Sequence, residues 1–191
     1  MDSVVFTKED LLAIELSVAT VAHMSLDLPI TPQTSDELKS LDSVALNSYT
    51  GLLSYHQYYA LTEKILSLSE SKATDVIDLH FCYNHWIEFT YRARGAFPHY
   101  IDLCIAYCKK DMSMYEKFKK TTEHPNFQYP YGSNISFPSF QRLAIIHEKQ
   151  GELMEAIEVC ELAIKYNIDD TTKGGFTGRL EKLKKKMAQF H

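Results

Sequence analysis

The chain has 191 residues, of which 45% are hydrophobic and 24% are charged, and its formal net charge is −5. A chain of this length buries roughly 70% of the surface that its unfolded state exposes, so it does not need a disulfide or a metal ion to fold. The acidic balance disfavours a dedicated nucleic-acid binder, which is normally basic. No apolar run approaches the roughly 18 residues of a membrane-spanning helix, which excludes a membrane protein of that kind.

Charge is distributed unevenly along the chain. Residues 1–80 carry four basic and twelve acidic residues (−8), residues 81–172 carry ten and twelve (−2), and residues 173–191 carry six and one (+5). A basic C-terminal segment can contact an anion. Such lysines more often form the solvated face of a helix and stabilise its C-terminus, so the pattern does not favour a nucleic-acid partner.

The four cysteines, Cys82, Cys104, Cys108 and Cys160, each lie within an apolar helical pattern. No secretory signal is recognisable before them, because the first residues have neither a basic region nor a long apolar region. We therefore expect reduced, buried thiols and a cytoplasmic location.

Scarce glycine (7) and proline (6), together with the near absence of alternating strand-like runs, predict an all-α fold of seven or eight helices. The first helix is expected to begin at Thr7, where Asp10 can complete a capping box. Pro29 and Pro32 follow this helix and break the pattern.

A second helical run extends from Asp36 to about Ser69, and Gly51 can bend or split it. The stretch "LSYHQYYALT" (53–62) places three tyrosines and a histidine in this run. We interpret these tyrosines as core residues with outward-facing hydroxyls rather than as a ligand site.

Two further helices are predicted at 75–94 and 97–120, separated by Gly95. The segment 121–139 is the longest irregular stretch of the chain, and a loop of this length is usually functional or disordered. Aromatic residues are uncommon in disordered linkers, and this segment contains Phe127, Tyr129, Tyr131 and Phe137. We therefore expect it to pack against the body of the protein or to be presented for partner binding.

The segment 137–167 has the pattern of two helices joined by a glycine. Large, small and glycine residues recur at the spacing of an approximately 34-residue unit that begins at Phe137; they are Phe140, Leu143, Ala144, Gly151, Leu153, Ala156, Cys160 and Ala163. Small residues would let the two helices approach closely, and Gly151 would end the first of them. The segment resembles a tetratricopeptide repeat, and His147 is its one departure.

A degenerate second copy lies 56 residues earlier, where Gly95 aligns with Gly151 and Cys104 with Cys160. Glu88 and Tyr100 stand where small residues are expected. The offset makes 121–139 an insertion between the two units.

The C-terminal stretch "TKGGFTGRLEKLKKK" follows "LAIIHEKQGELMEAIEVC". This combination resembles the end of bacterial and bacteriophage proteins of tetratricopeptide type, over roughly 137–187 but not over 1–75. The resemblance implies antiparallel helical hairpins without a shared enzymatic activity. We expect an N-terminal helical region (1–75) packed on two hairpins and a C-terminal capping helix (76–191), together forming one compact unit.

In this family the concave face is supplied by the first helix of each pair. The resemblance therefore implies a partner-binding groove formed by His85, Phe89, Arg92, Gln141, Ile145 and Glu148. The loop aromatics Phe127, Tyr129 and Tyr131 could cover or extend this groove.

No catalytic motif is present, and no cofactor is expected. His80, Cys82 and His85 are close in sequence but do not complete a tetrahedral set for a metal ion. The "KGGFTGR" turn could hold a phosphate through Lys173 and Arg179 where it opens the last helix. We prefer the interpretation that the turn folds this helix back as a cap.

The sequence thus favours a non-catalytic protein-interaction module that binds a protein or peptide partner. The alternative is an acidic helical inhibitor, for example one encoded by a phage, that occludes a nucleic-acid-binding or defence protein through the acidic residues 1–80. Salt should weaken the second kind of binding far more than the first. The 12 tyrosines and 10 phenylalanines would also allow a homodimer face.

Overall fold

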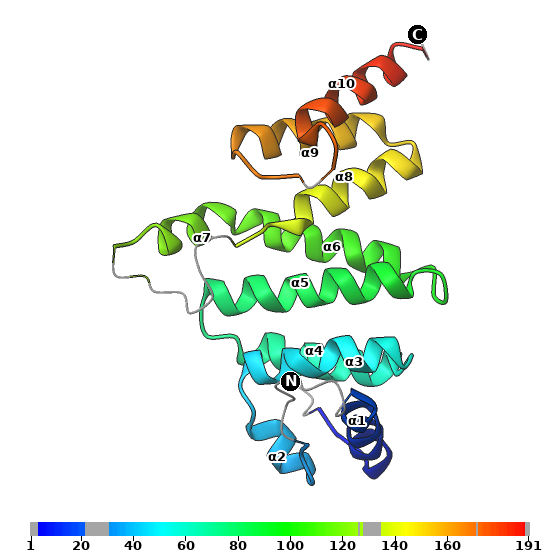
Figure 1. Ribbon diagram of the computed structural model, residues 1–191, viewed down its shortest axis with the longest axis vertical. Helices are drawn as coiled ribbons and strands as arrows, with labels where there is room; N and C mark the ends of the chain where they lie inside the picture. The colour runs from blue at the N-terminus through cyan, green and yellow to red at the C-terminus, as the bar shows by residue number, and fades with distance from the viewer. Residues whose placement is uncertain (1–3, 22–30, 126, 128–134, 171, 190–191) are drawn as a thin grey trace. The chain divides into compact units, whose positions relative to one another are not determined.

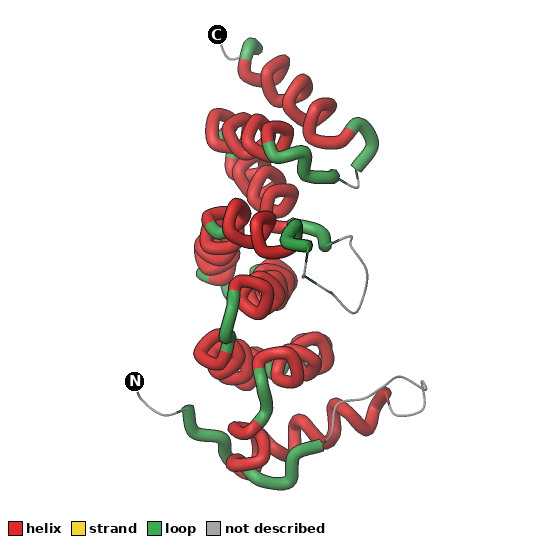
Figure 2. Tube along the Cα trace, turned by 90° about the vertical axis from the view of Figure 1, so that its left-hand side faces the viewer, coloured by secondary structure: helices red, strands yellow, loops and turns green. Residues whose placement is uncertain are grey.

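The structure is a computed structural model that describes residues 4–21, 31–125, 127, 135–170 and 172–189. Every regular element in these residues is an α-helix, which confirms the all-α prediction (Figures 1 and 2). The described residues form ten helices, more than the seven or eight expected, because two of the long predicted helices are interrupted. None of these ten has the length and apolar character needed to cross a bilayer.

The chain forms two compact units, unit 1 (1–104) and unit 2 (105–191), which divide within helix α6. The helices in chain order are α1 (Lys8–Val21), α2 (Ser35–Ser40), α3 (Ser43–Tyr55), α4 (Tyr59–Lys72), α5 (Val76–Ala93), α6 (Tyr100–Ser113), α7 (Tyr115–Thr122), α8 (Pro138–Gln150), α9 (Leu153–Lys165) and α10 (Gly175–Met187). The sequence pattern predicted a boundary at residue 75 instead. The division falls later because α5 packs against both α3 and α4.

The two units carry opposite net charges. Unit 1 contains six basic and fourteen acidic residues, a formal charge of −8. Unit 2 contains fourteen basic and eleven acidic residues, a formal charge of +3. The acidic character of the chain therefore belongs to unit 1 alone.

In unit 1 the predicted capping box at the start of α1 is confirmed. The Thr7 amide donates to Asp10 Oδ2 at 2.9 Å, and the Asp10 amide donates to Thr7 Oγ1 at 3.1 Å. The apolar face of α1 joins a core with α3 and α4 that includes the fully buried Ile14, Leu46 and Ile65.

The predicted helix over 36–69 is broken twice, and neither break is at Gly51. The first break follows Ser40, and Asp42 caps α3, since its side chain accepts the Ala45 amide at 2.8 Å. The second break is a turn at 56–58, where Gln57 adopts a left-handed conformation with φ of 62°. The prediction that the tyrosines of this stretch lie in the core is wrong for Tyr55, which is 78% exposed because it sits at the turn.

In unit 2 the predicted hairpin over 137–167 is present as α8 and α9. Gly151 ends α8 with a left-handed φ of 81°, and the following amide of Glu152 donates to the His147 carbonyl at 2.9 Å. Ala144 and Ala156 are completely buried between the helices. Small side chains here let the two helices pack closely.

Helix α10 packs on α9 as the predicted C-terminal cap. Phe176 and Leu183 are the buried residues of α10, at 3% and 1% exposure. On the surface, Lys184 Nζ lies 2.8 Å from Glu161 Oε1 of α9. The apolar residues of α10 face the hairpin, and its lysines face solvent.

A buried carboxylate holds the start of α8. Asp111 of α6 and Ser139 in the first turn of α8 are both fully buried, and the Ser139 hydroxyl donates to Asp111 Oδ2 at 2.5 Å. A negative charge beside a helix N-terminus is favourable because of the helix dipole. This contact ties α6 to α8 within unit 2.

The glycines of α3 and of the α8–α9 turn make a matched pair for a stability test. Gly151→Ala should lower the free energy of unfolding by about 1 kcal/mol, because alanine disfavours the left-handed conformation. Gly51→Ala should raise it by about 0.5–1 kcal/mol, because Gly51 lies inside a helix. A Cβ at either position meets no atom within 4 Å, so no steric clash complicates the comparison. Urea denaturation followed by circular dichroism measures both changes, and an equal loss in both variants would contradict the assigned backbone conformations.

Candidate functional site

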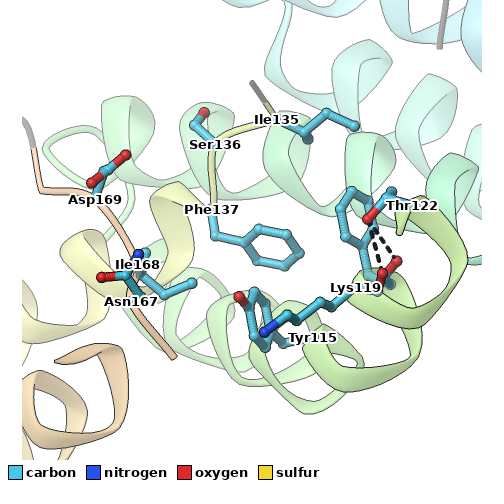
Figure 3. A pocket seen from close by; sticks show the side chains of 10 residues that line it. Tyr115, Lys119, Thr122, Ile135, Ser136, Phe137, Asn167, Ile168 and Asp169 are labelled. Atoms are coloured by element: carbon cyan, nitrogen blue, oxygen red, sulfur yellow. Dashed lines mark hydrogen bonds between the residues drawn. The ribbon is translucent and has the colours of Figure 1, made fainter. Parts of the chain in front are cut away.

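Unit 2 contains a hollow of about 280 Å³ beside α7, which we call the α7 pocket (Figure 3). It lies between α7, the segment 135–137 that leads into α8, and the segment 167–169 that follows α9. Its lining residues are Tyr115, Phe118, Lys119, Thr122, Ile135, Ser136, Phe137, Asn167, Ile168 and Asp169. Three separate stretches of the chain therefore build one concave site.

The floor of the α7 pocket consists of three aromatic rings. Tyr115 and Phe118 lie on the same face of α7. The Phe137 ring points towards Tyr115 from the segment before α8 (Figure 3). The Phe137 ring centroid lies 4.9 Å from that of Tyr115 and 4.8 Å from that of Phe118, and both pairs are close to perpendicular. All three side chains are at least nine-tenths buried. Edge-to-face packing of this kind is favourable and holds the floor in one arrangement.

The Tyr115 hydroxyl is engaged in a hydrogen bond within the protein. It donates to the Tyr166 carbonyl at 3.1 Å, and the two rings pack at 4.6 Å. Burial, and then the nearby Glu116 and Glu123 carboxylates, raise the pKa of Tyr115 above its ordinary value. The floor therefore presents neutral aromatic surface rather than an ionisable group.

The rim of the α7 pocket is polar. Lys119 is exposed and forms an ion pair with Glu123 at 3.8 Å. The Thr122 hydroxyl lies within hydrogen-bond distance of the Phe118 and Lys119 carbonyls. Ser136, Asn167 and Asp169 complete the rim as exposed side chains. An apolar floor with a polar edge is the anatomy of a protein-interaction hot spot.

The aromatic residues of the segment 121–139 lie in different environments. Phe137 packs against the body, as one of the two expectations for this segment stated. Phe127 is half-buried and lines a second hollow on α7. Tyr129 and Tyr131 lie outside the described residues.

Tyr115 and Phe118 were not predicted as site residues, because their segment was interpreted as the end of one long helix. The spacing of three between these aromatic residues, in the stretch "MYEKFKK", could have indicated an amphipathic helix of its own.

The three predicted groove residues of unit 1 do come together. His85, Phe89 and Arg92 line one small hollow between α5 and α3. The hollow has a volume of only about 30 Å³, which is roughly the space of one water molecule. Phe89 is 2% exposed and packs against the Tyr100 ring at 5.2 Å. Phe89 therefore belongs to the core rather than to an open groove.

His85 and Thr50 at this hollow resemble a base beside a hydroxyl. His85 Nδ1 lies 2.8 Å from Thr50 Oγ1, which itself lies 2.8 Å from the Asn47 carbonyl. A carbonyl can only accept, so the hydroxyl proton goes to Asn47 and the imidazole N–H donates to Thr50. The geometry is that of a structural hydrogen bond, not of a nucleophile activated by a base.

The predicted groove residues of unit 2 make contacts within the protein. Gln141 Nε2 donates to Asp170 Oδ1 at 2.7 Å, and Glu148 accepts from Arg179 at 3.0 Å. Ile145 is half-buried between them on α8. These side chains hold the α9–α10 connection against α8.

The two predicted anion contacts lie in different environments. Arg179 is paired with Glu148 and, at 3.7 Å, with the buried carboxylate of Asp170, so its charge is already neutralised. Asp170 Oδ1 also accepts from the backbone and hydroxyl of Thr172, both at 2.8 Å. Lys173 is exposed and forms no ion pair within the part of the chain that is described. The turn thus folds α10 onto the hairpin through Asp170 and Arg179.

The four cysteines are buried, as expected, and none of them forms a disulfide within the described residues. Burial raises the pKa of Cys160 to about 11, which keeps this thiol protonated and unreactive. Cys82 and Cys104 donate weakly to helix carbonyls at 3.7 and 3.6 Å. In the described ranges, no cluster of three or more His, Cys, Asp or Glu side chains is arranged to bind a metal ion.

Comparison with known proteins adds no relative: no protein-family model, no curated protein and no solved structure matches this chain.

Burial of His85 gives unit 1 a pH dependence. Burial lowers the pKa of His85, while Glu88 opposes the shift. The unfolded chain therefore binds the proton more readily, and stability falls as the pH drops below the ordinary histidine pKa. Between about pH 7 and pH 5, the wild type should lose more stability than His85→Asn, which keeps a donor near Thr50. His99→Asn, a change at an exposed histidine of the same unit, should follow the wild type. Parallel curves for wild type and His85→Asn would contradict the assignment.

Proposed function

We propose that this chain is a non-catalytic protein-interaction module that holds a protein partner by one apolar side chain in the α7 pocket. The observation that carries the proposal is the floor of three buried, edge-packed aromatic rings beneath a polar rim. Binding energy in protein interfaces concentrates where an anchor side chain fills such a pocket.

The size of the α7 pocket favours a side chain over a small-molecule substrate. Pockets for small ligands usually have volumes of roughly 300–1,000 Å³ and are enclosed on most sides. The α7 pocket, at about 280 Å³, lies at the lower limit of that range. No general base or nucleophile stands on its floor, where the Tyr115 hydroxyl is committed to a carbonyl.

The tetratricopeptide-like identity is part of the same proposal. The α8–α9 hairpin, with Gly151 at its turn and alanines between its helices, has the features that the resemblance implies. Helix α5 and the start of α6 form a similar pair across Gly95, with the Cys104 thiol against the Ile87 carbonyl. We place this module in a scaffold of hairpins of bacterial or phage type, in a reducing cytoplasm that keeps its cysteines from forming disulfides.

Selection of peptides from a random display library tests the proposal and does not require an identified partner. Wild-type protein should enrich peptides that share one large apolar residue. Ile135→Arg, which places a charge and extra bulk in the α7 pocket, should weaken their binding at least about tenfold, as loss of a hot-spot contact does.

Ile164→Arg is the matched control, because Ile164 is a surface isoleucine of α9, 41% exposed and outside the pocket. It should bind the selected peptides as the wild type does. Equal binding to wild type and Ile135→Arg would rule out the α7 pocket. If the selection instead enriches basic peptides, and these bind both variants as tightly as the wild type, the interaction lies on the acidic unit 1. That result would support occlusion of a basic partner.

A further inference from the structure

The face of α7 opposite the aromatic floor is basic. Lys117, Lys120, Thr121 and His124 follow one another at helical spacing, on the side away from Tyr115 and Phe118. Together with Phe127 they line an open hollow of about 600 Å³, which we call the basic hollow. The helix that supplies the floor of the α7 pocket thus also supplies a second recess of different chemistry.

The two lysines of the basic hollow lack an ion-pair partner among the described residues. Neither Lys117 nor Lys120 forms an ion pair with a described residue, whereas Lys119 is paired with Glu123. Two ammonium groups spaced three residues apart on a helix lie side by side and repel each other. A carboxylate placed between them would relieve this repulsion, as charge complementarity does in protein interfaces.

We propose that the basic hollow receives carboxylates of the same partner segment whose apolar side chain occupies the α7 pocket, so that the recognised segment is an acidic peptide. This inference rests on the proposed function. It adds the chemical class of the partner, and it assigns Lys117 and Lys120 as the residues that select it.

A third recess on α7 shares lining residues with both hollows. Lys119 and Lys120 line this recess of about 480 Å³ with Glu116 and Glu123. Half the circumference of a helix of about 10 Å diameter is about 16 Å. An extended chain covers that distance in about five residues. The acidic residues of the partner should therefore lie about five positions from its apolar anchor.

A nucleic acid fits this arrangement less well. It would bring phosphates to the two lysines but no apolar side chain for the aromatic floor. The −8 charge of unit 1 would also repel a long polyanion.

Short synthetic peptides test the inference directly. The probes are serine–glycine peptides that carry one phenylalanine and a pair of glutamates at varied spacing, each with a glutamine counterpart. Fluorescence anisotropy should show the tightest binding at a spacing of about five residues. The double variant Lys117→Gln/Lys120→Gln should weaken the glutamate peptide about fivefold and leave the glutamine peptide unchanged.

The matched control is Lys182→Gln/Lys185→Gln, which removes two exposed lysines at the same spacing from α10. It should bind both peptides as the wild type does. Suppose that Ile135→Arg weakens binding of the glutamate peptide but Lys117→Gln/Lys120→Gln does not. This result would overturn the present inference and leave the proposed function intact. Equal losses in both lysine double variants would also overturn it, by showing unspecific attraction.

A single-stranded oligonucleotide provides the last arm of the experiment. It should bind weakly and without dependence on Lys117 and Lys120. Tight binding that is lost only in the Lys117→Gln/Lys120→Gln variant would replace the acidic peptide with a nucleic acid.

Discussion

The packing of Phe137 against Tyr115 and Phe118 is the contact on which the candidate site depends. These rings join the start of α8 to α7, which lies about 20 positions earlier in the chain. Because the rings meet edge to face and are buried, they fix α7 beside the α8–α9 hairpin and leave the α7 pocket above them. Removing the ring of Phe137 would open a cavity and release α7 at the same time.

Polar contacts set the position of the remaining elements of unit 2. Asp111 holds the first turn of α8 through Ser139, and Asp170 holds the α9–α10 connection through Gln141 and Thr172. Such groups are costly to bury unless they are hydrogen-bonded, so each fixes one arrangement of the chain. Gln141, Glu148 and Arg179 are engaged in contacts within the fold, whereas Lys117 and Lys120 form no ion pair with a described residue.

Local pattern predicted some elements to within a residue or two. The α8–α9 hairpin and its Gly151 turn follow from helical periodicity and from one glycine that needs a positive φ, both of which are readable in the sequence. The break at Gln57 was not predicted, because neither glycine nor proline marks it; backbone hydrogen bonds close the turn, including one from the Tyr58 amide to the Leu53 carbonyl at 2.9 Å.

The candidate site was harder to predict because its contacts are distant in sequence. Phe137 was expected to pack, but its partners lie about 20 positions earlier on α7, and Ile168 and Asp169 come from beyond α9. The family resemblance instead predicted Phe89 as a groove residue. Phe89 packs against the Tyr59 and Tyr100 rings in the core of unit 1. A pattern shows which residues share a helix face, but which face is covered depends on the neighbouring helices.

Site-specific photo-crosslinking tests most directly whether the partner binds in the α7 pocket. A benzophenone amino acid at Ser136, on the rim, should crosslink to the phenylalanine of a bound glutamate-containing peptide, and mass spectrometry should locate the bond there. The same amino acid at Ile164, outside the pocket, should yield no crosslink. Crosslinks from Ile164 but not from Ser136 would contradict the account and place the partner elsewhere on the chain.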